Sequence, residues 1–179
     1  RFTGRSIEYV KKTGLWKRDK FRGTQLNQKK IGIIGMGRLG KMVLKYSLAF
    51  GMRVYFYDVK KNVGIDEKKI NAKRTDLNFL LKNSDIITLH ANYTDQNHHL
   101  ISFKEFELMS KNSLFINTSR GELVNEEALL DSLFNNKISA AAIDVIENEN
   151  KAISDGLNHP LIDYSSKNDN LIITPHIGG

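Results

Sequence analysis

The chain has 179 residues, of which 40% are hydrophobic and 26% charged, so it can bury the core of one domain and does not have the composition of a disordered protein. It contains no cysteine, which excludes disulfides, thiolate metal ligands and a cysteine nucleophile. No apolar run approaches the roughly 20 residues of a membrane helix and no leader peptide opens the sequence, so we expect a cytoplasmic protein with no membrane partner.

The positive charge is concentrated at the start of the chain. The net charge is +7, but residues 1–30 carry +8 and the remainder carries −1. Four apolar residues recur in this stretch at near-helical spacing, namely Ile7, Val10, Leu15 and Trp16. The pattern favours an amphipathic helix with a solvated basic face over a nucleic-acid-binding arm.

After residue 30, short apolar runs alternate with segments of helical pattern. The runs are continuous and mostly β-branched or aromatic, as in strands that are buried on both faces. They span 31–34, 54–57, 86–89, 114–116, 140–143 and 171–173. Strands that alternate with helices at this spacing predict one doubly wound α/β domain with a parallel sheet.

Capping signals lie between these strands. Thr75 precedes an apolar segment and is placed to cap a helix that begins at residue 76. Ser102 and Glu105 form a capping box for the next helix. Residues 147–170 are rich in Asn, Asp and Ser, and we predict a long loop there.

A glycine-rich motif follows the first strand directly. Residues 35–40 read GMGRLG, a G-x-G-x-x-G that opens a helix, which is the context in which this motif binds a dinucleotide. Gly35 permits the tight turn, Gly37 lets the backbone approach a pyrophosphate, and Gly40 lets helix and strand pack closely. The alternative is a glycine turn that serves packing alone.

An acidic residue follows the second strand. Asp58 lies 18 residues beyond Gly40, where a carboxylate can accept hydrogen bonds from the adenosine ribose hydroxyls. Because a carboxylate there repels a 2′-phosphate, we expect NAD rather than NADP. Lys60 and Lys61 weaken this discrimination slightly, although solvated loop lysines are the simpler interpretation.

Polar residues also follow the later strands. Arg120, Asp144 and His176 come just past the strands that begin at 114, 140 and 171. Because the carboxyl ends of parallel strands share one edge of a sheet, these side chains should converge there with the glycine loop. Glu149 can reach the same cleft.

These residue types suit hydride chemistry on a 2-hydroxy acid. A guanidinium such as that of Arg120 matches a carboxylate with two hydrogen bonds. Oxidation of the hydroxyl needs a base near neutral pH, for which His176 is suited, and Glu149 can orient the imidazole. Taken singly, Arg120, Glu149 and His176 each have a simpler structural interpretation. Their combination beside a dinucleotide-binding loop favours a catalytic role.

The other histidines carry weaker signals. His90 follows a strand and either lines the adenine side of the cleft or has a structural role. His98, His99 and His159 lie away from strand ends and are predicted to be surface residues. No pair of histidines or carboxylates has metal-ligand spacing, so we predict no metal site.

Several long segments resemble the D-isomer-specific 2-hydroxyacid dehydrogenases. They are IGIIGMGRLG (31–40), YFYD (55–58), SDIITLH (84–90), LFINTSRGELVNEEAL (114–129), AAIDVIENE (141–149) and TPHIGG (174–179). The resemblance implies that residues 1–179 are the Rossmann-type NAD-binding domain of an oxidoreductase, with the substrate domain absent. Residues 1–22 would be the interdomain helix and its following loop.

The resemblance also assigns roles to residues. Arg120 would anchor the substrate, His176 would donate or accept the proton, and Glu149 would pair with His176. Asp144 would hold the nicotinamide carboxamide. The other implied cofactor contacts are Arg38, Leu39, Asp58, Thr118, Ser119, Arg120, His176, Gly178 and Gly179.

Within the family, YFYD and TPHIGG are most similar to the phosphoglycerate dehydrogenases. This implies D-3-phosphoglycerate as substrate, a place in serine biosynthesis and a homodimer. Asn92 and Asn150 stand where the family usually has proline, which should loosen loops without removing chemistry. The alternatives are a dehydrogenase of glycerate, hydroxypyruvate or lactate, and a non-catalytic NAD-sensing module of the co-repressor type. We expect this chain alone to have negligible turnover.

Overall fold

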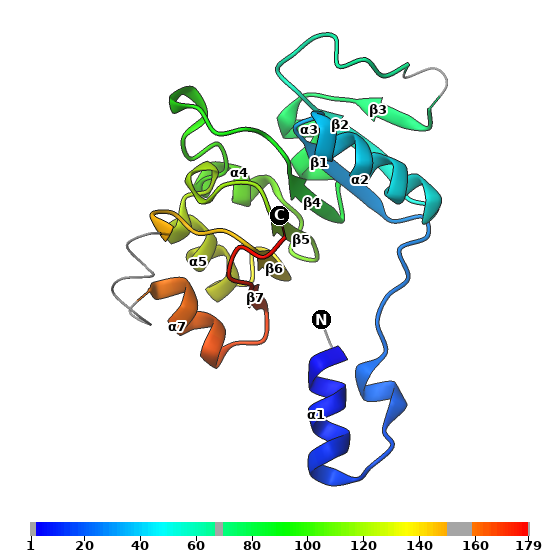
Figure 1. The fold of residues 1–179 in the computed structure, drawn as a ribbon, viewed down its shortest axis with the longest axis vertical. Helices are drawn as coiled ribbons and strands as arrows, with labels where there is room; N and C mark the ends of the chain where they lie inside the picture. Colours follow the sequence, from blue (N-terminus) through cyan, green and yellow to red (C-terminus); the bar gives the residue numbers. More distant parts are fainter. Residues whose placement is uncertain (1–2, 67–69, 150–158, 179) are drawn as a thin grey trace.

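The computed structural model describes residues 3–66, 70–149 and 159–178 (Figure 1). The strands are β1 (Lys30–Ile34), β2 (Arg53–Tyr57), β3 (Ala72–Arg74), β4 (Ile86–Leu89), β5 (Leu114–Asn117), β6 (Ala140–Ile143) and β7 (Leu171–Ile173). The α-helices are α1 (Thr3–Thr13), α2 (Arg38–Ala49), α3 (Leu77–Asn83), α4 (Phe103–Leu108), α5 (Glu126–Phe134) and α7 (Pro160–Lys167). Single 3-10 turns are η1 (Arg18–Phe21), η2 (Asp95–Asn97) and η3 (Gly121–Leu123).

The strands form a single parallel sheet in the order β3-β2-β1-β4-β5-β6-β7. From β1 the chain moves outward to β3, then returns to β4 on the other side of β1 and continues to β7. The order therefore reverses between β1 and β4, which opens a crevice at their carboxyl ends. This topology confirms the predicted doubly wound Rossmann fold.

Helices pack on both faces of the sheet, and the central strand β4 is buried along its whole length. On one face α2 packs against β1 and β2, around Ile33, Leu44 and Phe56. On the other face α3, α4, α5 and α7 form a layer in which Phe106 meets Phe115 edge-on, with ring centroids 5.3 Å apart. The continuous apolar pattern thus matches burial on both faces in β4, whereas Leu114 of β5 and Ile172 of β7 are partly exposed.

The six predicted strands are confirmed, and β3 is an additional one. It is a three-residue edge strand with the sequence Ala-Lys-Arg, which is too short and too polar to show a pattern. The predicted cap of α3 is wrong. The side chain of Asp76 accepts the N–H of Phe79 at 2.8 Å, whereas the buried hydroxyl of Thr75 makes no hydrogen bond within the described part of the chain. The carboxylate at 76 is the one placed to reach the first-turn N–H groups.

The capping box before α4 is confirmed, since the backbone N–H of Ser102 donates to the Glu105 carboxylate at 3.1 Å. The loop predicted over 147–170 is wrong in its second half, which contains α7. Pro160 begins this helix with a φ that suits the first turn, and Leu161 is buried against the sheet layer. The polar composition concealed a helix that buries little of its surface.

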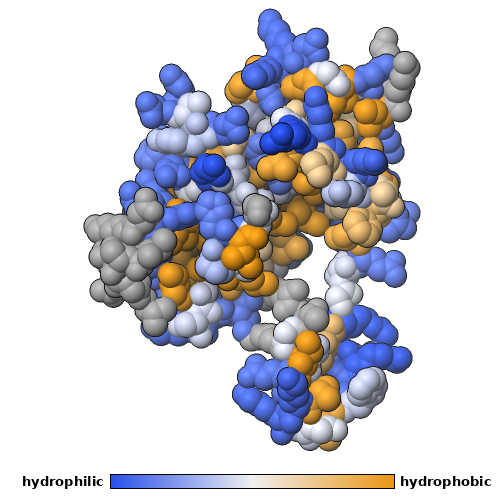
Figure 2. All heavy atoms as spheres, viewed as in Figure 1, coloured by the Kyte–Doolittle hydropathy of each residue, from blue (hydrophilic) through white to orange (hydrophobic). Residues whose placement is uncertain are grey.

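The predicted amphipathic helix at the start of the chain is confirmed in part as α1, which contains Ile7 and Val10, whereas Leu15 and Trp16 follow its end and lie outside it. It stands apart from the sheet and is joined to it by an extended segment after η1 (Figure 1). Its apolar side chains lie among hydrophilic neighbours on the molecular surface (Figure 2). The interdomain role of this segment stays a prediction.

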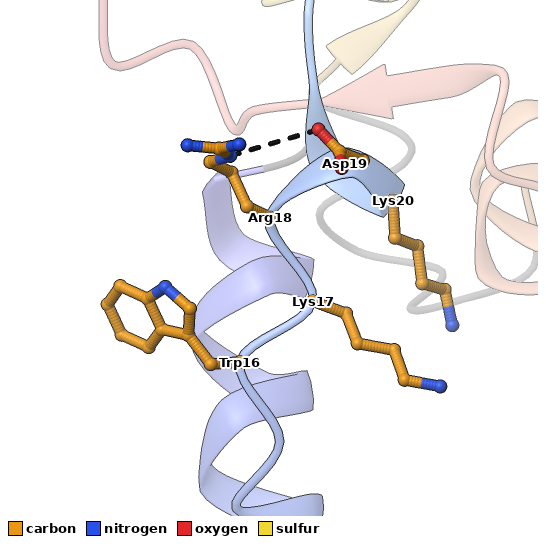
Figure 3. Close-up of a pocket in the computed structure, with 5 residues that line it drawn as sticks. All are labelled: Trp16, Lys17, Arg18, Asp19 and Lys20. Carbon is orange, nitrogen blue, oxygen red and sulfur yellow. Dashed lines mark ion pairs between the residues drawn. The ribbon is translucent and has the colours of Figure 1, made fainter.

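The connection between α1 and η1 lines a shallow surface cavity (Figure 3). Trp16 is 87% exposed there, and the Arg18 guanidinium lies 3.8 Å from the Asp19 carboxylate. Lys20 lies over the ring of Tyr9 at 4.4 Å. The basic side chains of this stretch are thus partly occupied by local contacts.

Among the helices that the structure describes, none is both long and apolar enough to cross a bilayer.

Candidate cofactor and substrate site

The three glycines of residues 35–40 meet three different demands. Gly35 has φ +94°, and a Cβ there would lie 2.5 Å from the backbone nitrogen of Ala91. A Cβ on Gly40 would collide with the carbonyl oxygen of Gly35. Around Gly37, which caps α2, a Cβ would meet no atom within 4 Å. The first and third glycines are required by the fold, and the second opens on free space at the helix N-terminus.

Asp58 connects the glycine loop to the end of β2. One carboxylate oxygen accepts the N–H of Met36 at 2.7 Å, and the other accepts the N–H of Lys60 at 2.8 Å. A carboxylate has about four lone-pair positions, so two remain for further donors such as ribose hydroxyls. Arg74 donates to the carbonyl oxygens of Asp58 at 3.1 Å and Lys60 at 3.2 Å, a contact that no sequence motif indicates.

A cleft of about 450 Å³ lies at the carboxyl edge of the sheet. It is lined by Leu39, His90, Ala91, Asn92, Tyr93, Thr118, Ser119, Arg120 and Glu122. The start of α2 and the loops after β4 and β5 therefore meet there. The structure thus brings four predicted cofactor contacts, Leu39 and residues 118–120, to one cavity.

The loop after β5 is organised by Asn117. Its amide donates to the carbonyl oxygen of Arg120 at 2.9 Å and accepts the N–H of Ser119 at 3.0 Å. The Ser119 hydroxyl donates to the carbonyl oxygen of Ala91, which joins this loop to the one after β4. The exposed Arg120 guanidinium donates to the Ser119 carbonyl at 2.7 Å. Asn117 thus fixes the backbone from which Arg120 extends.

His90 is half-buried in the same cleft. Its Nε2 lies 3.0 Å from the hydroxyl of Thr88, and burial lowers the pKa of the imidazole. It therefore lies beside Thr118–Arg120 as well as beside α2, which leaves both of its predicted roles open.

Asp144 holds the segment that follows β7. It is 6% exposed, and its carboxylate accepts hydrogen bonds from the Thr174 hydroxyl and from the N–H groups of Ile177 at 3.1 Å and Gly178 at 2.8 Å. The hydrogen bond from Thr174, with those from the two N–H groups, lowers the pKa of Asp144 despite its burial. In this structure the carboxylate shapes the loop of His176.

His176 and Glu149 form a pair. The Nδ1 of His176 lies 2.7 Å from a carboxylate oxygen of Glu149, and both side chains are partly exposed. His176 adopts the left-handed region with φ +53°, a conformation uncommon for a residue with a side chain. Both residues line a cavity of about 380 Å³ with Asp144 and Pro175. The pair is therefore accessible to a small molecule.

The loops after β5, β6 and β7 are joined. The N–H of Asp144 donates to the carbonyl oxygen of Asn117 at 2.9 Å, and Gly121 packs so closely on Ile146 that a Cβ would collide with its backbone. Asp144 in turn holds residues 174–178. Arg120, Glu149 and His176 therefore lie at one edge of the sheet, as the strand-end argument expects. Of the other predicted positions, Arg38 begins α2, and Gly179 and Asn150 lie outside the described residues.

Of the three histidines predicted to be surface residues, His98 is exposed as expected, whereas His99 and His159 are partly buried. All three pair with carboxylates that the prediction missed. His98 and His99 both lie 3.1 Å from the carboxylate of Glu147, and His159 lies 3.2 Å from that of Glu126. The partners are distant in sequence, so spacing could not find them. Two adjacent histidines were the only available signal.

This edge of the sheet fits a dinucleotide. The helix N-terminus is open at Gly37, the Asp58 carboxylate keeps acceptor capacity, and the cleft runs past the loops after β4 and β5. A pyrophosphate and a ribose have matching partners there.

Comparisons with known proteins agree with this geometry. Residues 1–178 match the family model of the D-isomer specific 2-hydroxyacid dehydrogenase NAD binding domain. A Staphylococcus haemolyticus protein, provisionally named a 2-hydroxyacid dehydrogenase, is 42% identical over 158 residues, which are 88% of this chain and 46% of that protein. The D-3-phosphoglycerate dehydrogenase of Methanocaldococcus jannaschii is 39% identical over 93% of this chain and 30% of its own length.

Among solved structures, the Aquifex aeolicus D-lactate dehydrogenase complexed with NAD and lactic acid is 38% identical, with a TM-score of 0.84 over 97% of this chain and 54% of that one. The chain thus spans about half the length of these relatives or less. It belongs to the D-isomer specific 2-hydroxyacid dehydrogenase family and corresponds to the NAD-binding domain of that family.

Proposed function

We propose that the protein is an NAD-dependent dehydrogenase that oxidises a D-2-hydroxy acid to the 2-oxo acid, or catalyses the reverse reaction. The observation that carries the proposal is the pair of His176 and Glu149 at 2.7 Å, on the same sheet edge as Arg120 and the glycine loop. Bound NAD supplies the hydride acceptor.

In this proposal His176 exchanges the hydroxyl proton. Its Nδ1 faces the Glu149 carboxylate, so the Nδ1–H tautomer donates to Glu149 and leaves a lone pair on Nε2. Nε2 takes the proton as the hydride leaves the substrate carbon. The carboxylate holds the ring in place and stabilises the imidazolium that forms.

Arg120 binds the substrate carboxylate. A guanidinium has five N–H donors in a planar fork, and the hydrogen bond to the Ser119 carbonyl directs this one along the cleft edge. Two parallel N–H donors fit the two carboxylate oxygens. This contact would place the substrate hydroxyl near His176 and its carbon near the cofactor.

For the cofactor we propose that Gly37 and the start of α2 bind the pyrophosphate and that Asp58 accepts the adenosine ribose hydroxyls. The two acceptor positions left on Asp58 match the two hydroxyls of a ribose diol. The negative charge of the carboxylate repels a 2′-phosphate. Asp58→Ala should therefore weaken NAD binding and narrow its advantage over NADP.

We propose D-3-phosphoglycerate as the first substrate to test. The YFYD and TPHIGG segments and the M. jannaschii relative support it. The A. aeolicus D-lactate dehydrogenase supports lactate to a similar degree, so lactate and glycerate are the alternatives. A homodimer in the cytoplasm completes the proposal, and light scattering of the full-length protein tests the dimer.

The deciding experiment is an assay of the full-length protein for NADH formation with these acids, in parallel with calorimetric NAD binding. His176→Ala should lower turnover by about 10²–10⁴-fold and spare NAD affinity. The general-base assignment fails if His176→Ala keeps the wild-type rate. Intact NAD binding without oxidation of any 2-hydroxy acid would instead favour the NAD-sensing alternative.

A further inference from the structure

A second group of ligating side chains lies outside the dehydrogenase site. The Nε2 atoms of His98 and His99 each lie 3.1 Å from a different carboxylate oxygen of Glu147. The two imidazole rings are stacked, with centroids 3.8 Å apart and planes inclined by 23°. One ligand atom from each of the three residues falls within 4.8 Å of the others. Both nitrogens thus point to the same small volume.

The dimensions suit a transition-metal ion. Zinc binds imidazole nitrogen at about 2.0–2.1 Å and carboxylate oxygen at about 2.0–2.2 Å, so two ligand atoms in a tetrahedral site lie roughly 3.3–3.4 Å apart. The observed nitrogen–oxygen separations of 3.1 Å are close to this value before any adjustment. The side chains of His98, His99 and Glu147 are 41%, 31% and 25% exposed, so an ion and a completing water can reach them.

The ligands are held from behind by a second set of contacts. Glu126 accepts the backbone N–H of Glu147 at 2.8 Å and pairs with His159 at 3.2 Å. The backbone N–H of His99 donates to the carbonyl oxygen of Glu122 at 2.8 Å, and His99 itself has φ +51°. The three side chains thus extend from backbone that is fixed independently of any ion.

We propose that His98, His99 and Glu147 bind a divalent transition-metal ion of the zinc type, with water in the fourth position. Two imidazoles and one carboxylate form a ligand set that suits zinc, and adjacent hydrogen-bonded groups keep such ligands oriented. The ion would take the place of the protons now shared between the imidazoles and the carboxylate. It would fasten the segment after η2 to the segment that carries Glu149.

Titration of the tag-free, chelator-treated full-length protein with Zn²⁺ tests the proposal, with Co²⁺ absorption as a report of tetrahedral coordination. We expect one Zn²⁺ per chain and a higher melting temperature with the ion bound. His98→Ala and Glu147→Gln should each weaken Zn²⁺ binding about tenfold or more. His99→Asn should do the same, and asparagine tolerates the left-handed backbone of that position.

Two controls locate the effect. His176→Ala removes the histidine–carboxylate pair of the dehydrogenase site and should leave Zn²⁺ affinity unchanged. Glu107→Gln removes an exposed carboxylate that pairs with Lys137, away from the cluster, and should also have no effect.

The proposal is overturned if Zn²⁺ fails to bind stoichiometrically, if binding survives the His98 and Glu147 substitutions, or if it disappears in His176→Ala. The three side chains would then form an ion-pair network without a metal. The readout is independent of NAD oxidation, so its failure is distinguishable from failure of the dehydrogenase assignment.

Discussion

Asp144→Asn tests how the segment that carries His176 is held. One carboxylate oxygen of Asp144 accepts the Thr174 hydroxyl and the N–H of Ile177, while the other accepts the N–H of Gly178 at 2.8 Å. An asparagine can keep the first oxygen in place. Its amide nitrogen then faces the N–H of Gly178, so a donor replaces an acceptor.

The magnitude follows from that single exchange. A hydrogen bond to a charged group contributes about 1.5–3 kcal/mol, and the other amide orientation would lose two hydrogen bonds instead of one. If the loss appears in global unfolding, the melting temperature should fall by about 3–12 °C, at about 2–4 °C per kcal/mol for a domain of this size. If the segment opens locally, the Gly178 amide should exchange its hydrogen roughly 10- to 150-fold faster.

The effect depends on pH with a definite sign. Hydrogen bonds from Thr174 and from the two N–H groups lower the folded-state pKa of Asp144, so its contribution is complete above the unfolded pKa of about 3.9 and is lost as pH falls through the folded pKa. The difference in unfolding free energy between wild type and variant should be constant near neutral pH. It should shrink as the pH falls below about 4. Thermal melts and hydrogen exchange at neutral and acidic pH measure it.

Asp163→Asn is the matched control. Asp163 pairs with Lys167 at 2.7 Å on exposed α7, and loss of such a pair changes stability by about 0.5 kcal/mol at most. The reasoning is refuted if Asp144→Asn behaves like this control, or if its deficit is unchanged at acidic pH.

The other predictions concern the glycine loop, the catalytic pair and the core. Gly40→Ala should lower the melting temperature because its Cβ collides with a backbone carbonyl, whereas Gly37→Ala should melt like wild type but bind NAD more weakly in calorimetry; equal effects of the two would contradict these assignments. In the full-length protein, His176→Ala should lower kcat by about 10²–10⁴-fold, and Glu149→Gln should lower it by less. The affinity for NAD should be unchanged in both variants. A lowered NAD affinity would instead indicate that the pair takes part in cofactor binding. Phe115→Ala should cost about 3–5 kcal/mol in denaturant unfolding, since the ring is fully buried; a small loss would mean that the core repacks.

The strands of the sheet could be predicted from the sequence because the residues of each strand reflect how that strand is buried. A run such as Ile86–Leu89 is buried along its whole length, and only a strand covered on both faces needs that composition. The missed elements lack this property. Strand β3 is an edge strand that pairs with β2, and α7 buries few residues, so tertiary contacts rather than local pattern determine both.

The candidate site divides in the same way. Arg120 and His176 could be predicted to lie at the same edge of the sheet because strand order and strand ends determine where their loops begin, although the two side chains line different cavities. The environment of Asp144 could not be predicted, because it depends on how residues 174–178 fold back over the end of β6. The ligand group around Glu147 escaped detection for a similar reason, since its histidines come from a loop 48 and 49 residues earlier.

The glycine loop shows how far a motif can be interpreted from the sequence alone. Gly37 and Gly40 are both glycine positions of the motif, and the sequence does not distinguish them. In the structure Gly37 faces open space, whereas Gly40 faces the carbonyl oxygen of Gly35. Substitution of Gly40 thus acts through folding, whereas substitution of Gly37 can act on a bound pyrophosphate without a loss of stability. The same distinction separates Asp144, whose carboxylate is occupied by its own chain, from Asp58, which keeps acceptor positions for a ligand. We therefore expect free hydrogen-bonding capacity in the folded structure to separate the residues that bind NAD from those that hold the binding loops in place.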